Sequence, residues 1–183
     1  MRRALLLLVA ALWAGAASGD DAVWDRLRAG GYVLLVRHAQ TTPGVGDPAG
    51  FRLDDCGTQR NLSEEGRAQA RRLGEIFRIH AVPIVEVRSS RWCRCVDTAR
   101  LAFGRVEPWP PIDSMFGDPS REDDLKRAVT ELSAQVKPPR NVILVTHGSN
   151  VLALLGVHPA MGETVAVGSA DGALKIVGRI PAP

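Results

Sequence analysis

An arginine and a histidine follow directly on a run of apolar residues near the start of the chain. Residues 33–36 read Val-Leu-Leu-Val, and Arg37 and His38 come next. A short apolar run of this kind is typical of a strand that is buried on both faces. At the end of such a strand, an imidazole nitrogen is placed to attack phosphorus while a guanidinium group binds the phosphoryl oxygens. The pair therefore indicates chemistry on a phosphorylated molecule.

Two other segments place similar groups after predicted strands. Residues 142–146 form a second apolar run, followed by His147 and Gly148, and residues 89–94 follow a shorter run at 84–87. Functional loops gather outside the carboxyl ends of parallel strands, so we expect all three segments at one edge of a sheet. Helices that begin in two of these segments would add unpaired backbone N–H groups there. The three segments together predict an anion-binding site.

The elements expected around these segments alternate between strands and helices. Apolar runs predict strands at 32–36, 84–87, 142–146, 164–167 and 174–177. Amphipathic periodicity predicts helices after the N-cap residue Ser63, from Ser90 to about Phe103, from Arg121 to Val136 and from Asn150 to Leu155. Residues 106–111 contain too much proline for a central strand. The pattern predicts an α/β fold, a three-layer sandwich in which helices cover both faces of a mostly parallel central sheet.

The composition fits one globular domain that follows a targeting segment. The 183 residues are 45% apolar and 23% charged, which is enough chain for a single core. A basic start, an apolar stretch over 4–14 and small residues up to Gly19 have the order of a secretory signal peptide. We therefore expect a signal peptide at 1–19, a domain at 20–183 and a periplasmic or secreted location. An uncleaved N-terminal anchor is the alternative.

The charge balance gives no support to nucleic-acid binding. Of the 23 basic residues, Arg2 and Arg3 fall in the signal segment, so the remainder nearly balances the 20 acidic residues. Nucleic-acid-binding domains carry a basic excess. The expected partner is a small phosphorylated substrate, with no nucleic acid and no stable membrane insertion after signal cleavage.

Three cysteines and four histidines raise the questions of a disulfide and of a metal site. Cys93 and Cys95 are two residues apart on a predicted helix and point to different faces, so they cannot both meet Cys56. In an oxidising compartment we expect one disulfide, from Cys56 to either Cys93 or Cys95, with one thiol left over. The close Cys and His spacings of zinc sites are missing from the sequence. We predict no metal and no cofactor.

The motifs, taken in order, resemble those of the histidine phosphatase superfamily, also called the phosphoglycerate mutase-like superfamily. Residues 37–41, Arg-His-Ala-Gln-Thr, are similar to its Arg-His-Gly signature, with Ala39 in the glycine position. Residues 62–70 resemble its helix opening, residues 90–99 its second motif, and residues 146–148, Thr-His-Gly, its third. The resemblance covers the chain after the signal segment and implies a small exported phosphatase.

The resemblance implies a two-step phosphoryl transfer in which His38 becomes phosphorylated and water then releases phosphate. Arg37 and Arg94 would hold the equatorial phosphoryl oxygens, where charge must be neutralised. His147 would complete this clamp as a proton-bearing donor. Arg91 competes with Arg94 for its role, and the motif register favours Arg94.

The roles beyond this clamp fall to residues with weaker sequence signals. Thr41 and Gly148 are expected to contact phosphate. In the superfamily a carboxylate after the second motif protonates the leaving oxygen, and the candidates in this chain are Asp113, Asp118 and Glu122. We select Asp118 because its neighbours place it on a loop; the alternative is that all three only cap or solvate the next helix.

The two remaining histidines, His80 and His158, lack a comparable context. We expect both to be structural or surface residues.

The expected activity is hydrolysis of a phosphomonoester by a metal-independent phosphatase of the histidine acid type. Only a loop and one helix are predicted between Arg94 and His147, which indicates a small open site that admits water. Export points to an envelope or periplasmic phosphorylated small molecule or sugar as substrate. Two alternatives stay open. One is a catalytically silent phosphate- or phosphosugar-binding protein of the same fold, motivated by Ala39 and the unassigned acid, and the other is a phosphomutase.

Overall fold

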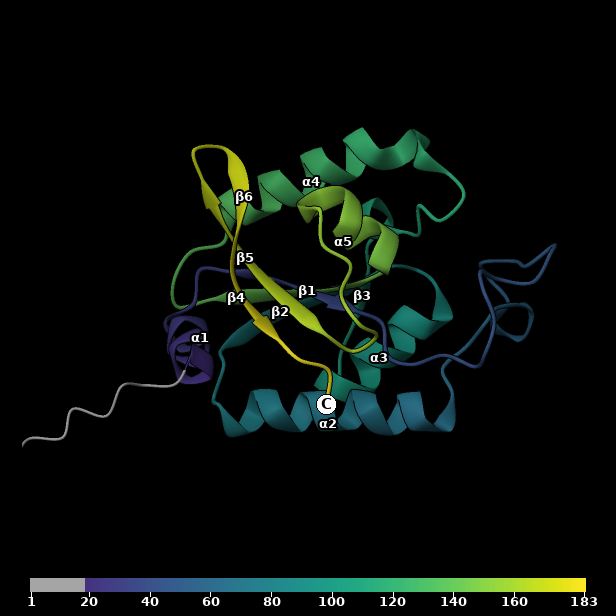
Figure 1. Cartoon of the computed structure of the whole chain (residues 1–183), viewed down its shortest axis with the longest axis horizontal. Coiled ribbons are helices and arrows are strands. Elements are labelled where there is room, and N and C mark those ends of the chain that lie inside the picture. The colour runs from purple at the N-terminus through teal and green to yellow at the C-terminus, as the bar shows by residue number, and fades with distance from the viewer. Residues whose placement is uncertain (1–18) are drawn as a thin grey trace, which may run out of the picture.

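A six-stranded sheet runs through the centre of residues 19–183, which are the residues that the computed structural model describes (Figure 1). The strand order is β3-β2-β4-β1-β5-β6. The strands are β1 (Val33–Arg37), β2 (Ile84–Ser89), β3 (Glu107–Pro108), β4 (Asn141–Thr146), β5 (Thr164–Ala170) and β6 (Ala173–Ile180). Strands β1 to β4 pair in parallel, whereas β5 and β6 join as antiparallel strands. The predicted signal peptide at 1–19 lies outside the described residues, apart from Gly19.

Helices cover both faces of this sheet. They are α1 (Gly19–Ala29), α2 (Glu64–Ile79), α3 (Cys93–Phe103), α4 (Glu122–Gln135) and α5 (Gly148–Leu155), with short 3₁₀ turns η1 (Cys56–Thr58), η2 (Pro110–Ile112) and η3 (Pro119–Arg121). Helices α1, α2 and α3 lie on one side of the sheet in Figure 1, and α4 and α5 lie on the other. The predicted α/β sandwich is confirmed.

The apolar run at 33–36 is explained by two separate cores. Leu34 and Val36 pack into the core beneath α1, α2 and α3, while Val33 and Leu35 pack into the core beneath α4 and α5. Successive strand residues point to opposite faces, so a strand covered on both sides must be apolar at every position. All four side chains are fully buried.

The register of the parallel strands brings the three predicted segments to one edge. Arg37, the last residue of β1, pairs with Thr146 of β4, and Ser89 of β2 pairs with Val145. The residues that follow these strands therefore start side by side. This confirms the expectation that strand ends gather the candidate chemistry.

Several boundaries differ from the sequence expectation for physical reasons. Helix α1 was not predicted, because only Trp24 and Leu27 of this largely polar segment are buried, and its position depends on packing against the sheet. Helix α5 begins at Gly148 rather than Asn150. The proline-rich segment at 106–111 contributes only the two-residue edge strand β3. Within residues 19–183, none of the helices is both long and apolar enough to cross a membrane.

Candidate active site

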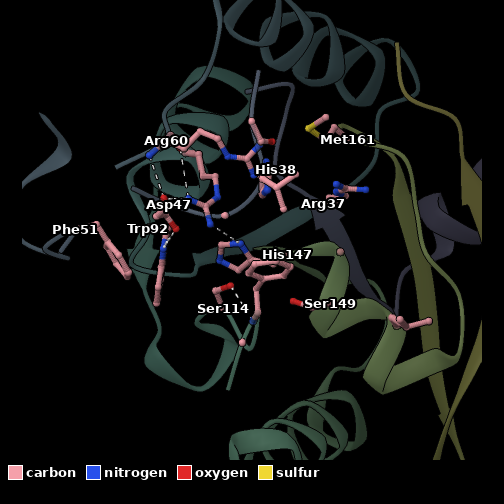
Figure 2. A pocket seen from close by; sticks show the side chains of 18 of the residues that line it. Arg37, His38, Asp47, Phe51, Arg60, Trp92, Ser114, His147, Ser149 and Met161 are labelled. Carbon is pink, nitrogen blue, oxygen red and sulfur yellow. Dashed lines mark hydrogen bonds and ion pairs between the residues drawn. The ribbon is translucent and has the colours of Figure 1, made fainter. Parts of the chain in front are cut away.

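A pocket of about 730 Å³ opens at the carboxyl edge of the parallel strands. We call the part of its lining formed by Arg37, His38, Arg94 and His147 the floor; Figure 2 labels Arg37, His38 and His147. Its outer part, which we call the rim, carries the large apolar side chains Val45, Phe51, Trp92, Phe116 and Leu152. The predicted nucleophile His38 and the three residues of the predicted clamp thus meet in one pocket.

His38 is oriented with one ring nitrogen available for attack. Its Nδ1 lies 2.9 Å from the carbonyl oxygen of Ala39. Because a carbonyl only accepts hydrogen bonds, Nδ1 carries the proton and Nε2 carries the lone pair. Burial lowers the pKa of His38 to about 3, against the opposing effect of the Ala39 carbonyl, and Arg94, Arg37 and Arg60 lower it further. The imidazole is therefore neutral near pH 7.

Ala39, the departure from the glycine of the signature, does not line the pocket. Its side chain is fully buried and packs with Leu62 and Ala70. Its backbone N–H donates to Thr98 Oγ1 at 3.0 Å, and its carbonyl oxygen accepts the hydrogen bond from His38 Nδ1. The extra methyl group therefore fills a small apolar cluster and leaves the floor unobstructed.

His147 is held between Arg94 and Ser90. Arg94 Nη2 lies 3.4 Å from His147 Nδ1, and His147 Nε2 lies 2.8 Å from Ser90 Oγ. Burial, followed by the charges of His38 and Arg94, lowers the pKa of His147 well below its usual value. A guanidinium can only donate, so Nδ1 accepts and the proton sits on Nε2, donated to Ser90. In this arrangement His147 does not direct its proton toward the floor, in contrast to the donor role expected from the sequence.

Three arginines in the pocket lining have a buried Nε atom without a hydrogen-bond partner. Among the described residues of the lining they are Arg37, Arg60 and Arg94. Buried polar groups are normally paired, so three such donors at one pocket indicate a site for an anion. The pocket contains one carboxylate, Asp47, against the three guanidinium groups. The excess of two positive charges suits a phosphate dianion.

Gly148 lets Arg37 pass close over the start of α5. A Cβ atom at position 148 would lie 3.2 Å from Arg37 Cζ and 3.0 Å from His158 Nε2. Arg37 is fixed there because its Nη1 donates to the carbonyl oxygen of Pro159 at 2.7 Å. The glycine of the third motif therefore serves close packing at the floor.

Asp47 and Arg60 are site residues that the sequence did not reveal. Asp47 accepts hydrogen bonds from Arg94 Nη1 at 2.7 Å, Trp92 Nε1 at 2.9 Å and the Arg60 backbone N–H at 3.0 Å. Arg60 Nη1 donates to Thr41 Oγ1 at 2.9 Å. Although burial raises the pKa of Asp47, these hydrogen bonds lower it overall. Both residues lie within the irregular loop between β1 and α2, which has no periodicity, so no pattern in the sequence marks them.

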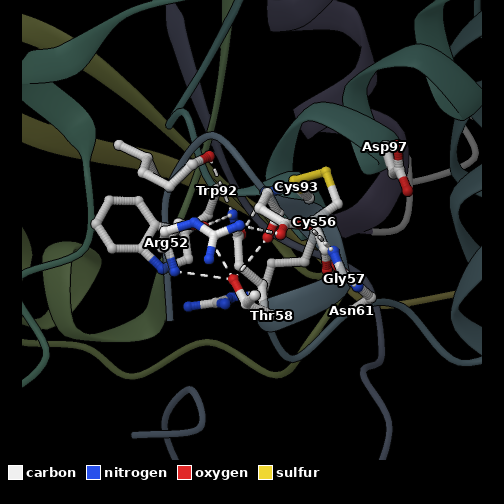
Figure 3. Close-up of a disulfide and its surroundings, with 12 residues drawn as sticks. Arg52, Cys56, Gly57, Thr58, Asn61, Trp92, Cys93 and Asp97 are labelled. Carbon is white, nitrogen blue, oxygen red and sulfur yellow. Dashed lines mark hydrogen bonds and ion pairs between the residues drawn. A yellow bond between two sulfur atoms is a disulfide. The ribbon is translucent and has the colours of Figure 1, made fainter. Parts of the chain in front are cut away.

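A disulfide fastens this loop to the start of α3. Cys56 and Cys93 form the bond, which is one of the two pairings that the sequence left open (Figure 3). Cys95 keeps a buried free thiol, whose pKa burial raises to about 12. Because Trp92 and Arg94 flank Cys93, the bond anchors the loop beside both floor and rim.

None of the three carboxylates proposed as the proton donor lines the pocket. Asp118 is exposed and caps η3, where it accepts from the backbone N–H and hydroxyl of Ser120. Asp113 is buried and paired with Arg91, and Glu122 pairs with Lys126 on the surface of α4. The position of Asp118 therefore does not support its choice as the proton donor. The alternative, in which the carboxylates only cap or solvate the following turn or helix, describes Asp118 and Glu122.

The structure also distinguishes other residues that the sequence grouped around the site. Arg94 is in the pocket, whereas Arg91 turns away to Asp113. Thr41 is buried, does not line the pocket, and contacts two residues that do, Arg60 and Met161. His158, expected to be structural or on the surface, lines the pocket with Nδ1 3.5 Å from Arg37 Nη1.

The remaining histidine lies away from the pocket, since His80 stacks on Trp24 with a ring-centroid distance of 3.9 Å. Within residues 19–183, His, Cys, Asp and Glu side chains form no group of three that could hold a metal ion.

Known proteins with similar sequences or folds were found in two of three comparisons. Residues 33–118 match the family model of the histidine phosphatase superfamily (branch 1). A comparison with curated protein sequences finds no match.

Similar solved structures include the protein histidine phosphatase SixA complexed with tungstate, with a TM-score of 0.58, 17% identity, and coverage of 82% of this chain and 97% of that chain. Mycobacterial glucosyl-3-phosphoglycerate phosphatase with inorganic phosphate gives a TM-score of 0.60 and 17% identity, over 83% and 97% of the two chains. A protein of Thermus thermophilus gives a TM-score of 0.52 and 24% identity, with coverage of 82% of this chain and 99% of that chain. At these identities the structures show a shared fold. The family match over residues 33–118, together with this shared fold, makes the histidine phosphatase superfamily the group that the chain resembles.

Proposed function

We propose that the protein is a phosphomonoester hydrolase that works through a phosphohistidine on His38. The observation that carries the proposal is the meeting of an unprotonated His38 Nε2 with three buried, unpaired guanidinium Nε donors in one pocket. A neutral imidazole is the nucleophilic form, and the guanidinium groups stabilise charge on the transferring phosphoryl oxygens.

The reaction has two balanced steps. In the first, His38 Nε2 forms a bond to phosphorus while the bond from phosphorus to the ester oxygen breaks; the electron pair leaves with that oxygen, which takes a proton from water. In the second, a water oxygen attacks phosphorus and gives up a proton to solvent, the phosphorus–nitrogen bond breaks with its electron pair on His38 Nε2, and inorganic phosphate leaves. Arg37 and Arg94 hold the phosphoryl oxygens in both steps.

Contact with Ser90 could allow His147 to donate a hydrogen bond to the phosphoryl group. A hydroxyl group can both donate and accept, and Ser90 Oγ contacts His147 Nε2 and, at 3.4 Å, Asp113 Oδ1. If a phosphoryl oxygen takes the place of Arg94 Nη2 beside His147 Nδ1, the favoured tautomer becomes the one in which Nδ1 carries the proton and Nε2 accepts from Ser90. The donor role expected for His147 then arises on substrate binding.

Hydrolysis is favoured over a mutase reaction because the pocket is open to solvent. Val45 and Phe116 on the rim are 87% and 65% exposed. Water can therefore reach the phosphohistidine, whereas a mutase must retain its phosphorylated intermediate away from water.

An envelope location belongs to the same proposal. Disulfides persist in oxidising compartments, and the bond between Cys56 and Cys93 supports export of this chain. Fractionation of producing cells should recover the protein, with Cys56 and Cys93 oxidised, outside the cytoplasm. Recovery of a reduced protein in the cytoplasm would contradict export.

The activity is tested with p-nitrophenyl phosphate, without added metal, between about pH 4 and pH 8, a window that spans carboxylate and histidine titration. We expect turnover and rapid labelling of the protein by a ³²P-phosphomonoester, quenched in alkaline detergent. His38→Ala should abolish both signals, and His80→Gln, outside the pocket, should leave them unchanged. Phosphate binding without turnover at any pH would instead identify a silent binding protein.

A further inference from the structure

The rim is the part of the pocket that would contact the alcohol half of a substrate, and it is apolar. Of the seven large apolar side chains exposed on the described surface, four lie there: Val45, Phe51, Phe116 and Leu152. Exposed apolar residues that gather in one place mark a binding surface. The rim therefore fits an apolar group better than a polyol.

Aromatic rings make up one wall of the rim. Phe51 and Trp92 lie beside each other in Figure 2, with ring centroids 5.8 Å apart. The Trp92 ring is fixed by its hydrogen bond to Asp47 and lies 5.5 Å from the His147 ring, at the boundary with the floor. A ring attached to a phosphate held on the floor would meet these faces, and aromatic pairs of this kind add binding energy beyond burial.

The pocket also lacks a carboxylic acid that could protonate a leaving oxygen. Among the described residues, Asp47 is the single carboxylate in the lining, and its two oxygens are occupied by Arg94, Trp92 and the Arg60 N–H. These donors keep Asp47 ionised. A leaving alkoxide, whose conjugate acid is about as weak as water with its pKa of about 15.7, needs such an acid. A phenolate, whose conjugate acid has a pKa near that of tyrosine, about 10, departs without one.

We propose that the preferred substrates are aryl phosphomonoesters, in which the phosphate is esterified to a phenolic oxygen. This inference rests on the proposed function. The ring packs against Phe51, Trp92 and Phe116 while the phosphate lies on the floor. As His38 Nε2 bonds to phosphorus, the phosphorus–oxygen bond breaks and the electron pair leaves with the phenolate, which takes a proton from water. The apolar rim favours a substrate with a ring, and the lack of a carboxylic acid favours a phenolic leaving group. Both features therefore favour aryl phosphomonoesters.

Comparison of three substrates separates the effect of binding the ring from the effect of the leaving-group oxygen. Phenyl phosphate has the ring and a phenolic leaving group, benzyl phosphate has the ring and an alkyl leaving group, and glycerol phosphate has neither ring nor phenolic oxygen. We expect kcat/KM to fall by on the order of a hundredfold or more from phenyl to benzyl phosphate, the usual contribution of a general acid. Benzyl phosphate should still inhibit competitively, with a Ki at least about threefold below that of glycerol phosphate.

Variants test the two parts of the inference separately. Phe116→Ala should raise the Ki of benzyl phosphate by about threefold to tenfold and leave that of inorganic phosphate unchanged. Ile79→Ala, which truncates another exposed apolar side chain outside the pocket, is the matched control and should change neither. His158→Gln should leave the ratio of phenyl to benzyl turnover unchanged. An increase in that ratio would identify His158 as a proton donor. It would overturn the part of the inference that says the pocket has no acid for the leaving oxygen.

The outcomes also separate this inference from the proposed function. Equal kcat/KM values for phenyl, benzyl and glycerol phosphates would overturn the inference and leave the phosphatase intact. Turnover of none of them, with no phosphate on His38, would overturn the proposed function itself.

Discussion

The floor and the rim of the pocket are built in different ways. The floor residues Arg37, His38 and His147 directly end or follow two paired central strands, and Arg94 lies in the first turn of α3. The rim residues Val45 and Phe51 lie on an irregular loop outside the sheet. Two isolated β-bridges, Thr41 to Leu62 and Arg52 to Asp55, lie within this loop, and the disulfide at Cys56 and polar contacts of Asp47 and Arg60 hold it as well. The difference teaches that the sheet positions the residues proposed to carry out the reaction. The cross-linked loop positions Val45 and Phe51, which belong to the rim proposed to contact the rest of the substrate.

The largest expected effect separates two neighbouring arginines. Arg94→Ala should lower kcat/KM for p-nitrophenyl phosphate by about a hundredfold to a thousandfold, the typical loss of one donor to a developing charge. Arg91→Ala, which removes the partner of Asp113 outside the pocket, should cost less than about tenfold. Steady-state kinetics of both variants measures the contrast. Equal losses would mean that Arg91 also belongs to the floor.

Removing the disulfide should loosen the rim while leaving the floor in place. The double variant Cys56→Ser with Cys93→Ser should lose about 2–4 kcal/mol of unfolding free energy in urea titrations. Its KM for phenyl phosphate should rise because Asp47 and Arg60 lose their anchor, while His38 is still labelled. Reduction of the wild-type protein with dithiothreitol should reproduce both changes. An unchanged KM would show that the loop holds its position without the bond.

Acid should destabilise the folded protein, in part because the buried histidines His38 and His147 resist protonation in the native state. The pKa of His38 is lowered from its usual value of about 6.5 to about 3, and that of His147 is also lowered, by burial first. Between these values the unfolded chain binds protons that the native state does not, so stability present above about pH 6.5 is lost as pH falls toward 3. Each histidine contributes at most about 1.4 kcal/mol per pH unit.

The comparison that tests this pH dependence is wild type against His38→Gln. Urea denaturation between pH 7 and pH 4 should show a shallower pH dependence of unfolding free energy in the variant. Titration of the His38 ring protons near pH 6.5 by NMR would contradict the buried neutral state.

The smallest effect is expected at the carboxylate that the sequence selected as the acid. Asp118→Asn should change kcat/KM by less than about twofold, because the side chain is exposed and only caps η3. Asp47→Asn should cost about tenfold or more, since it removes a charge-assisted hydrogen bond to Arg94. A large loss in Asp118→Asn would mean that the segment at 114–118 moves over the pocket during turnover.

How far the sequence could predict the site depends on how each residue is held. His38 and His147 were found because a strand buried on both faces leaves a continuous apolar run, and the residue after it has a predictable place. Asp47, Arg60 and His158 were missed because loop residues have no period that relates them to the sheet. Asp118 was selected from local loop chemistry, and that same chemistry, an oxygen that caps the next turn, explains why it faces away from the pocket.

The sequence by itself determined the α/β order, the two-sided burial of the central strands and the strand-end groups, because these depend on periodicity and on local backbone preferences. Tertiary structure alone decided which cysteine pairs with Cys56, which loop residues surround Arg94, and which side chains form the rim. These choices depend on contacts between segments far apart in the chain, such as Asp47 with Arg94, whose energies arise only when the fold has formed. For the same reason the apolar rim and the missing carboxylic acid, which together indicate an aryl phosphomonoester, became visible only in three dimensions.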